Sequence, residues 1–302
     1  MSGAWRRLGR LALDTRAASW ARSHAALPAV ERQGDQLFVY LSLRDADGRA
    51  RIGRTELTMG STPRFSPLEP EPVLDLGALG AFDDSGVTTS CVVTDGPRRL
   101  LYYTGWSRGV TVPFYLMAGL AVSVDGGPFI RASAAPVLER SAVDPFLTAS
   151  PFVMRDGSRW RAWYVSATEW RPGPSGPRHY YHLRYAESAD GVAWTRDGTV
   201  CLDYASPDEH AFARPWVVRD DDLYRMWFAV RGDRYQIGYA ESKNGVHWAR
   251  QPSPVLTAGS DEWESEMVAY PCVFDWEGRR YMLYNGNDYG RTGVGLAVLD
   301  RQ

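Results

Sequence analysis

One pattern recurs five times along this chain, and it constrains the fold more than any other feature. Each copy reads as a strand, a polar turn with Asp or Gly, and a second strand. The copies begin at Ala26, Thr88, Thr148, Phe212 and Val268. Their corresponding positions are Pro28, Ser90, Pro151, Pro215 and Pro271, which lie 62, 61, 64 and 56 residues apart. Such even spacing indicates an internal structural repeat.

Each copy continues with further strands. A third strand begins at Arg51, Ala118, Leu183, Ile237 and Val294, and in three copies a DG or NG pair follows it, which is typical of a tight turn. A short fourth strand is expected from Glu71, Ala135, Gly198 and Ser253. Four antiparallel strands in succession make a propeller blade. The sequence therefore predicts an all-β fold, a five-bladed β-propeller of four-stranded blades, in one domain spanning residues 1–302.

The fifth copy lacks a fourth strand because the chain ends at Gln302. The segment GRLALD, from Gly9, resembles the missing strand. We expect it to join the last blade and close the ring, since the edge of that blade would otherwise stay unpaired. The alternative is an N-terminal strand without a partner.

Composition narrows the partners and the compartment. The net charge is −2 and no block of Lys and Arg exists, which argues against a nucleic acid or an anionic membrane as partner. No segment has the apolar core of a signal peptide or the length of a membrane span. Cys91, Cys201 and Cys272 lie far apart without CxxC spacing, so we expect buried thiols in a cytoplasmic protein.

The expected site is one mouth of the central channel. In an up-and-down meander, the segment before each first strand and the segment after each second strand reach the same mouth. Carboxylates that converge there from different blades would repel one another and separate their pKa values, as acid–base catalysis requires. The candidate catalytic residues are Asp84, Asp144, Glu209 and Glu266. The alternative for each is a solvated loop acid.

Further side chains in the same segments are candidate substrate-binding residues. They are His24, Arg44, Trp106, Glu169, Tyr181, His210, Arg214, Arg231, Glu264, Asn285 and Asn287. Arginines there suit a phosphate or carboxylate on the substrate, and aromatic rings suit stacking on a sugar.

Three other signals carry little weight. His179 and His182 form an HxxH pair without a third ligand nearby, so no metal is expected. The stretch GDRYQIGYAESKNG, from Gly232, lacks GxGxxG spacing, and no cofactor is expected. Ser23 and His24 are adjacent in an expected extended strand, where neighbours face opposite sides, so we expect no activation of the Ser23 hydroxyl.

The recurring Pro-x-Val, turn, tyrosine-rich strand and YAES-DG--W pattern resembles the five-bladed propeller glycosidases, the superfamily of β-fructosidases, arabinosidases and mannoside phosphorylases. The resemblance covers nearly the whole chain and implies carboxylate chemistry at glycosidic bonds. The family acid at the start of blade one is replaced by His24, and the acidic pair of the phosphorylases before blade two by Thr88 and Thr89. Arg155–Asp156–Gly157 mimics an Arg-Asp-Pro triplet but follows the first strand, at the other end of the blade.

Three functions follow from this combination. The leading hypothesis is a glycoside hydrolase-like enzyme that acts on a sugar or glycoside by carboxylate acid–base chemistry. The second is a lyase that eliminates water, or a glycosyl transferase, acting on a sugar, nucleoside or sugar nucleotide; the missing family acids favour it. The third is a sugar-binding propeller without catalysis. All three imply a small sugar-containing ligand, and the oligomeric state stays open.

Overall fold

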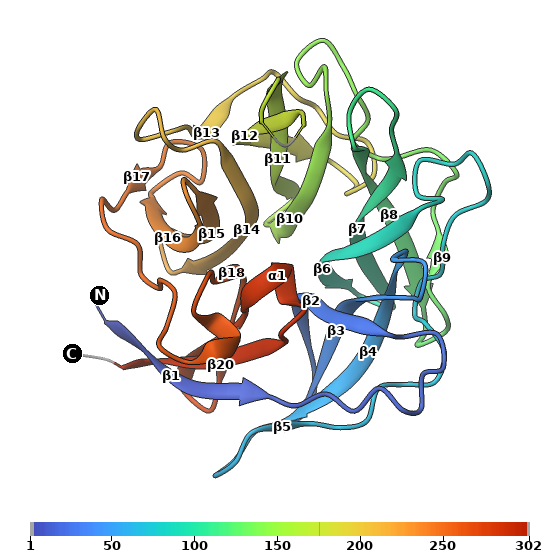
Figure 1. The fold of residues 1–302 in the computed structure, drawn as a ribbon, viewed down its shortest axis with the longest axis vertical. Coiled ribbons are helices and arrows are strands. Elements are labelled where there is room, and N and C mark those ends of the chain that lie inside the picture. Colours follow the sequence, from blue (N-terminus) through green and yellow to red (C-terminus); the bar gives the residue numbers. More distant parts are fainter. Residues whose placement is uncertain (1–2, 175, 301–302) are drawn as a thin grey trace.

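Short antiparallel strands surround a common centre in the computed structural model, which describes residues 3–174 and 176–300 (Figure 1). The strands form one sheet of four strands and two of eight. Each larger sheet joins two runs of antiparallel strands through a single parallel residue pair, Ala50 with Gly86 or Tyr181 with Ala211. The runs are called groups 1 to 5 below, in chain order.

Group 1 comprises β2 (Ser23–Gln33), β3 (Gln36–Arg44), β4 (Ala50–Thr58) and β5 (Arg64–Phe65). Group 2 comprises β6 (Gly86–Asp95), β7 (Arg98–Arg108), β8 (Phe114–Val124) and β9 (Ile130–Arg131). Group 3 comprises β10 (Thr148–Asp156), β11 (Arg159–Arg171), β12 (Arg178–Ser188) and β13 (Val200–Leu202). Group 4 comprises β14 (Ala211–Asp220), β15 (Leu223–Arg231), β16 (Tyr235–Ser242) and β17 (Ala249–Arg250). Group 5 comprises β18 (Ala269–Trp276), β19 (Arg279–Asn285), β20 (Val294–Asp300) and the N-terminal β1 (Ala4–Leu11).

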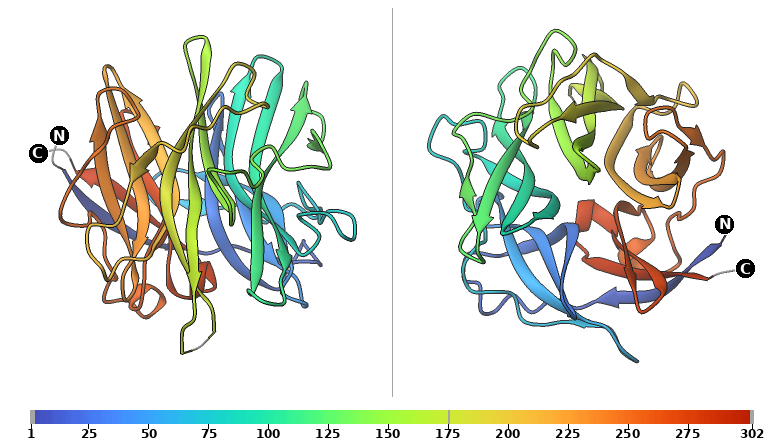
Figure 2. Two further views of the ribbon diagram at one scale, coloured as in Figure 1. Left: turned by 90° about the horizontal axis from the view of Figure 1, so that it is seen from above. Right: turned by 180° about the vertical axis from the view of Figure 1, so that it is seen from behind.

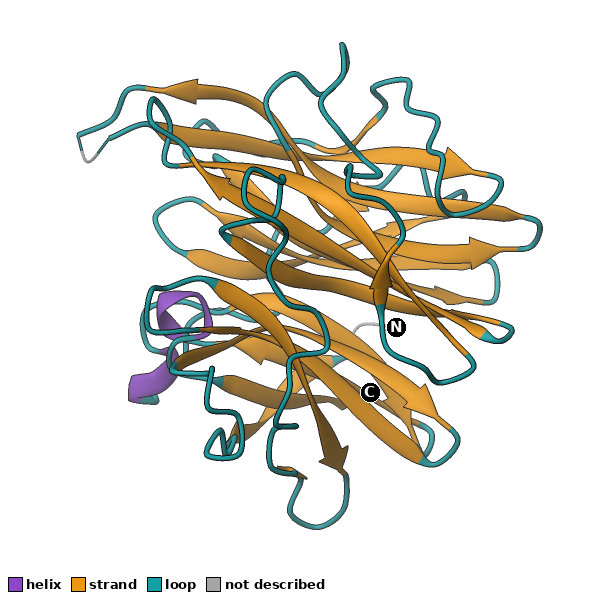
Figure 3. Ribbon diagram, turned by 90° about the vertical axis from the view of Figure 1, so that its right-hand side faces the viewer, coloured by secondary structure: helices purple, strands orange, loops and turns teal. Residues whose placement is uncertain are grey.

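The first strand of each group lies nearest the centre (Figure 1), and the view from behind in Figure 2 shows the same groups around it. The loops before the first strands and after the second strands lie at one end, called the mouth below. This end also holds the two helical segments of group 5, the 3₁₀ turn η1 (Glu262–Glu264) and α1 (Asn287–Gly290), as well as the turn between β11 and β12 (Figure 3).

Side chains tie three of the inner strands, β2, β6 and β10, to the preceding group. The Leu27 amide donates to Asn285 Oδ1 (2.8 Å), the Thr89 amide to Ser42 Oγ (2.9 Å) and the Ser150 amide to Thr104 Oγ1 (2.8 Å). These acceptors all stand on second strands. Neighbouring groups are therefore held in register by polar bonds as well as by apolar packing.

The turn after the third strand makes a second link between groups. In the YAES-DG--W segment of group 3, Ser188 Oγ accepts from the Gly191 amide (2.9 Å), and Gly191 O accepts from the Tyr102 hydroxyl of group 2 (2.7 Å). Group 4 repeats the arrangement, with Gly245 O accepting from Trp163 Nε1 of group 3 (2.7 Å). The repeated motif thus fastens a turn onto the group before it.

Buried cysteines supply further links. Cys272 Sγ accepts from the Val30 amide (3.3 Å) and Cys91 Sγ from the Val153 amide (3.2 Å), each joining the inner strands of two adjacent groups. Burial raises the pKa of both thiols to about 12. The prediction of buried, unpaired cysteines is confirmed for all three.

The predicted fourth strands need correction. Three of the four segments contribute one bridging residue each, Leu74, Leu138 and Leu256, and only Gly198–Tyr204 contains a strand, β13. Each of the three carries a proline two residues before its bridging leucine, which removes a backbone donor and limits pairing. The strands β5, β9 and β17 lie earlier in the chain than predicted.

The N-terminal strand pairs as predicted, although it begins before Gly9. Strand β1 runs antiparallel to β20, with Trp5 opposite Leu299 and Leu11 opposite Val294. The buried Trp5 ring also packs edge-on against Trp227 of group 4, with ring centroids 6.1 Å apart. The two ends of the chain therefore share one sheet.

In the described part of the chain, no helix has the length and apolar character needed to cross a membrane.

We predict that deleting residues 1–14 strongly lowers the melting temperature or causes aggregation, because the edge of β20 loses its partner. Trp5→Ala should lower the free energy of unfolding by about 3–5 kcal/mol, as expected for emptying a buried tryptophan site. Leu8→Ala on the same strand is the control, because Leu8 is 41% exposed. Denaturant unfolding measures all three. A deleted chain that melts with the parent would contradict the prediction.

Candidate functional site

The carboxylates in the loops before the first strands are held inside their own groups. Asp83 is buried and accepts from the Tyr103 hydroxyl (3.0 Å) and from Arg131 Nε (2.8 Å). Asp144 is 0% exposed and accepts from Ser166 Oγ (2.7 Å) and Arg196 Nη1 (2.9 Å). The Tyr164 hydroxyl and Arg184 bind the same Asp144 carboxylate.

Groups 4 and 5 repeat this arrangement. Glu209 receives two hydrogen bonds from Arg250, of 2.7 and 2.6 Å. Burial opposes the charged form of Glu209, but the bonds from Arg250 and from the Ala205 amide hold its pKa below the ordinary value. Glu264 is buried and accepts from the Tyr284 hydroxyl (2.9 Å) and from Arg7 Nε of β1 (3.1 Å).

In three of these networks, the acid and its tyrosine partner are separated by the same number of residues. Asp83 and Tyr103, Asp144 and Tyr164, and Glu264 and Tyr284 are each separated by twenty residues. The arginines Arg131, Arg250 and Arg7 stand on the outermost strands β9, β17 and β1. At the same three positions group 1 has the buried apolar residues Ala21, Leu41 and Phe65. In groups 2 to 5 the recurring acid is therefore part of the packing of its own group, and group 1 packs with apolar residues instead.

The expectation that four carboxylates converge on the channel is corrected accordingly. Both oxygens of Asp144 are occupied by hydroxyl and arginine partners, and Arg250 occupies both oxygens of Glu209. Asp84 shapes its own loop by accepting from the Gly80 amide (3.0 Å) and Ser85 Oγ (2.9 Å). Among the four candidates, Glu266 is exposed at the mouth.

Every inner strand has a β-bulge at the repeat position that precedes the corresponding proline or serine. The residues at that position are Leu27, Thr89, Ser150, Arg214 and Tyr270. Four of them, all except Thr89, have a left-handed backbone, with φ between 46° and 57°. Such strained conformations and bulges recur beside functional sites, where they aim side chains. None of the five residues is a carboxylate.

Arg214 crosses the centre from group 4. Its side chain is 1% exposed and donates to the carbonyls of Pro28 (2.5 Å) and Leu27 (3.4 Å) in group 1 and of Thr89 in group 2. Burial lowers its pKa to about 10. The predicted role of Arg214 in substrate binding is therefore corrected, because its guanidinium joins three inner strands.

Four tyrosines gather at the mouth above this arginine. Tyr181 and Tyr235 stand at equivalent positions of β12 and β16, while Tyr270 lies on β18 and Tyr289 on α1. The Tyr235 ring centroid is 6.3 Å from that of Tyr270 and 6.1 Å from that of Tyr289. The Tyr181 hydroxyl is buried and has no hydrogen-bond partner in the described structure. Burial, then the nearby hydroxyls of Tyr235, Tyr270 and Tyr289, hold the pKa of Tyr181 well above its ordinary value.

A cavity of about 470 Å³ opens beside these tyrosines. It is lined by Arg231, Asp233, Arg234, Tyr235, Ser265, Glu266, Met267, Asp288 and Tyr289. Asn287 Oδ1 accepts from the amides of Glu266 (2.9 Å) and Met267 (3.1 Å) and so fixes the Glu266 loop. Arg231 Nη1 donates to the Tyr289 hydroxyl (2.9 Å). The predicted residues Glu266 and Arg231 thus meet in one cavity, and Asn287 positions the first of them.

Three histidines at the mouth have lowered pKa values. Burial, followed by the charges of Arg44 and Arg291, lowers the pKa of His24 to about 4. Burial, then His210, Arg231 and Arg178, lowers the pKa of His179 to about 4. His210 has a lowered pKa for related reasons and accepts from Arg178 Nη2 (2.8 Å).

The expectation for Ser23 and His24 was wrong. His24 Nδ1 lies 3.0 Å from Ser23 Oγ. His24 has a left-handed φ of 64°, so the two side chains meet instead of facing opposite sides.

The other predicted binding residues divide by role. Arg44 is exposed at the mouth and Trp106 is half-buried there. Glu169 pairs with Arg171, whose hydrogen bond lowers the pKa of Glu169. Asn285 is 0% exposed and binds the Leu27 amide and the Ala25 carbonyl, so it joins groups 5 and 1. Sequence reasoning missed Tyr235, Tyr270 and Arg178; the equivalence of Tyr235 with Tyr181 was the signal that could have found the first.

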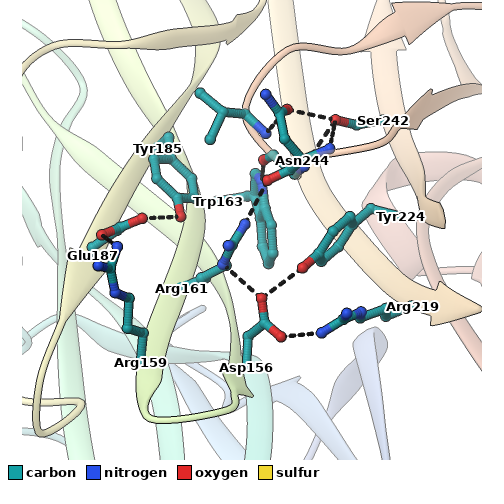
Figure 4. A network of polar contacts seen from close by, with 12 residues as sticks. Asp156, Arg159, Arg161, Trp163, Tyr185, Glu187, Arg219, Tyr224, Ser242 and Asn244 are labelled. Carbon is teal, nitrogen blue, oxygen red and sulfur yellow. Dashed lines mark hydrogen bonds and ion pairs between the residues drawn. The ribbon is translucent and has the colours of Figure 1, made fainter. Parts of the chain in front are cut away.

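Cavities of about 560 and 840 Å³ lie at the far end, between groups 3 and 4. Figure 4 shows why this region is structural: Asp156 accepts from the Tyr224 hydroxyl (2.5 Å) and pairs with Arg161 (2.8 Å) and Arg219. The Arg155–Asp156–Gly157 triplet therefore links two groups, away from the mouth. No cluster of metal-binding side chains occurs within residues 3–174 and 176–300.

Comparisons with known proteins identify relatives of this chain in sequence and in fold. No model of a known protein family matches the sequence. The chain is 44% identical over 299 residues to the uncharacterized protein Rv1502 of Mycobacterium tuberculosis strain ATCC 25618 / H37Rv, covering 98% of this chain and 99% of that protein. The chain belongs to the Rv1502 family. The MT1551 protein of strain CDC 1551 / Oshkosh is equally similar, at 44% identity over 299 residues.

Solved structures with the same fold are glycoside hydrolase propellers. A thermostable family-43 glycoside hydrolase has a TM-score of 0.69 at 16% identity, covering 95% of this chain and 92% of its own. The endo-arabinase of Bacteroides thetaiotaomicron VPI-5482 has a TM-score of 0.64 at 14% identity, covering 94% and 97%. A glycosyl hydrolase from Bacteroides ovatus has a TM-score of 0.73 at 15% identity, covering 99% and 94%. The predicted resemblance in fold is confirmed.

We predict that Arg214→Met lowers stability rather than ligand affinity alone. The substitution leaves the Leu27, Pro28 and Thr89 carbonyls without their charged donor, and a hydrogen bond to a charged group contributes about 1.5–3 kcal/mol. Urea unfolding should show a loss of at least that size. Arg64→Met is the control, since Arg64 is exposed on β5 and has no salt bridge in the described residues. Equal stability of the two variants would contradict the assignment.

Proposed function

We propose that this chain is a carbohydrate-active enzyme that binds its sugar at the mouth, among Tyr181, Tyr235, Tyr270 and Tyr289. The proposal includes a single domain whose five groups are the blades of one propeller, closed by β1. One observation carries it: the Tyr181 hydroxyl is buried without a partner among the described residues. An unsatisfied buried hydroxyl is costly, and a sugar hydroxyl entering the mouth would supply the missing hydrogen bond.

The surroundings suit a polyhydroxyl ligand. Aromatic rings offer flat apolar faces, and their hydroxyls are hydrogen-bond donors and acceptors. His179 stacks on Tyr181 at 4.2 Å between ring centroids, which stiffens one wall of the site. The solved propellers with this fold are named as glycoside hydrolases, which supports a sugar ligand for this chain.

Glu266 is the proposed acid–base residue of hydrolysis. It lines the cavity next to Tyr235 and Tyr289, and Asp288 is a second carboxylate on the same wall. Hydrolysis of a glycoside uses one protonated acid and one ionised carboxylate, and the cavity offers this pair for the two roles. Asp84, the other leading candidate of the sequence, is engaged in its own loop.

A second function, elimination or glycosyl transfer on the same scaffold, is favoured by the five inner-strand positions. Leu27, Thr89, Ser150, Arg214 and Tyr270 include no carboxylate. A lyase or transferase can use an arginine and tyrosine environment for a charged substrate without two inner acids. The products distinguish the functions, because hydrolysis of an aryl glycoside releases the aryl alcohol and elimination leaves an unsaturated sugar.

The test is turnover of a panel of aryl glycosides and sugar nucleotides by the parent and two variants. Glu266→Gln should lower turnover about 10²–10⁴-fold, the usual contribution of acid–base catalysis. Tyr181→Phe should mainly raise KM, since one neutral hydrogen bond contributes about 0.5–1.5 kcal/mol.

Glu262→Gln is the matched control, because Glu262 is an exposed acid of the neighbouring η1 turn. Near-parental turnover by Glu266→Gln on an accepted substrate would remove Glu266 from the mechanism. Binding of sugars without any turnover by the parent would favour the non-catalytic function.

A further inference from the structure

The arginines of this chain divide into two sets. Many on the outer strands and far turns pair with carboxylates, as Arg131 does with Asp83 and Arg250 with Glu209, although Arg64 on β5 has no such partner among the described residues. Within the described residues, four arginines near the mouth histidines have no carboxylate within 4 Å: Arg44, Arg178, Arg231 and Arg291. The charges of Arg44 and Arg291 lower the pKa of His24, and those of Arg231 and Arg178 lower the pKa of His179. Four arginines without a carboxylate partner therefore lie near the histidines of the mouth, where the tyrosines gather.

The hydrogen bonds of these arginines are directed at neutral groups. Arg231 donates to the Tyr289 hydroxyl at 2.9 Å and lies over the Tyr235 ring, 5.5 Å from its centroid. Arg178 donates to His210 Nδ1 at 2.8 Å. Each guanidinium keeps further N–H donors for a ligand, because arginine has five.

The negative groups nearby stay apart from these arginines. Asp233, Glu266 and Asp288 line the same cavity as Arg231 and are exposed. None of the three forms an ion pair with an arginine among the described residues, whereas the buried Asp144 and Glu264 both do. The Arg231 guanidinium therefore remains free to pair with an anion that enters the cavity.

We infer that the mouth selects a sugar that carries an oxyanion, a carboxylate or a phosphate, and that Arg231 binds this group while Tyr181 binds the sugar. The inference rests on the proposed function and names its substrate class. Arg231 has the geometry for it, since a planar guanidinium binds two oxygens of one anion, and the Tyr289 hydroxyl fixes its orientation. The Tyr181 hydroxyl, on a side chain of 6% exposure and without a partner in the described structure, marks the adjoining sugar position.

The test is calorimetric titration of the full chain with glucose, galactose and mannose, with their uronates, with their 1-phosphates, and with inorganic phosphate. At least one anionic sugar should bind about tenfold more tightly than its neutral parent, equivalent to about 1.4 kcal/mol. Its affinity should fall as salt is raised, as for a screened ionic contact. Uronate and 1-phosphate binding separately identify the carboxylate and the phosphate as the recognised group.

Variants locate the contact. Arg231→Gln should lower the affinity for the preferred anionic sugar about tenfold or more and leave any binding of the neutral sugar unchanged. Arg231→Lys should retain part of the affinity, because it keeps the charge and loses the planar fork. Arg64→Gln, on the distant strand β5, is the matched control and should bind like the parent.

The outcomes separate the inference from the proposed function. Neutral sugars that bind as tightly as their anionic forms, with binding weakened by Tyr181→Phe, would overturn the inference and retain the sugar site. Anionic binding that Arg231→Gln leaves intact would also overturn it. Failure of every sugar to bind would overturn the proposed function together with the inference, and tight binding of inorganic phosphate alone would do the same.

Discussion

Carboxylates that pair with arginines of the same group hold strand groups 2 to 5 together, and in groups 2 and 5 a tyrosine and an arginine from the outermost strand complete the network. Asp83 with Tyr103 and Arg131, and Glu264 with Tyr284 and Arg7, show the arrangement in groups 2 and 5. Each network ties the leading loop, the second strand and the outer edge of one group. A buried charge is tolerated only when paired and hydrogen-bonded, so the three positions depend on one another.

The pairing of these acids with arginines determines which side chains remain available to a substrate. Once arginines of the same group neutralise the repeated acids, the acids are unavailable to a substrate, and the centre is left to other residues. Arg214 joins three inner strands by binding carbonyls of two other groups. The mouth holds tyrosines, histidines with lowered pKa values, arginines without a carboxylate partner among the described residues, and the exposed carboxylates Glu266 and Asp288. The proposed sugar site therefore lies in the cavity at the mouth, where Arg231 stands beside Glu266 and Asp288, and not among the buried acids Asp144 and Glu264.

The repeat was readable from sequence because its spacing and turn chemistry are local, and so was the pairing of the N-terminal strand. The direction in which the side chains of the loop acids point could not be predicted from the sequence. A loop aspartate preceding Pro151 by seven residues is compatible with either the channel or the blade interior, and the choice depends on Tyr164 and Arg196, which lie twenty and 52 residues away. The left-handed backbone at His24 and Arg214 likewise comes from bulges, and the residue types at these positions do not predict it.

The most direct test is a crystal structure of the protein soaked with the anionic sugar that binds most tightly. We expect density for the sugar at the mouth, with one of its hydroxyls in hydrogen-bond contact with Tyr181 Oη and its anionic group on Arg231. The side chains of Asp144 and Glu209 should remain bound to Arg196 and Arg250. A sugar bound against Asp144 or Glu209, or in the far-end cavities beside Tyr185 and Tyr224, would contradict the proposed sugar site at the mouth.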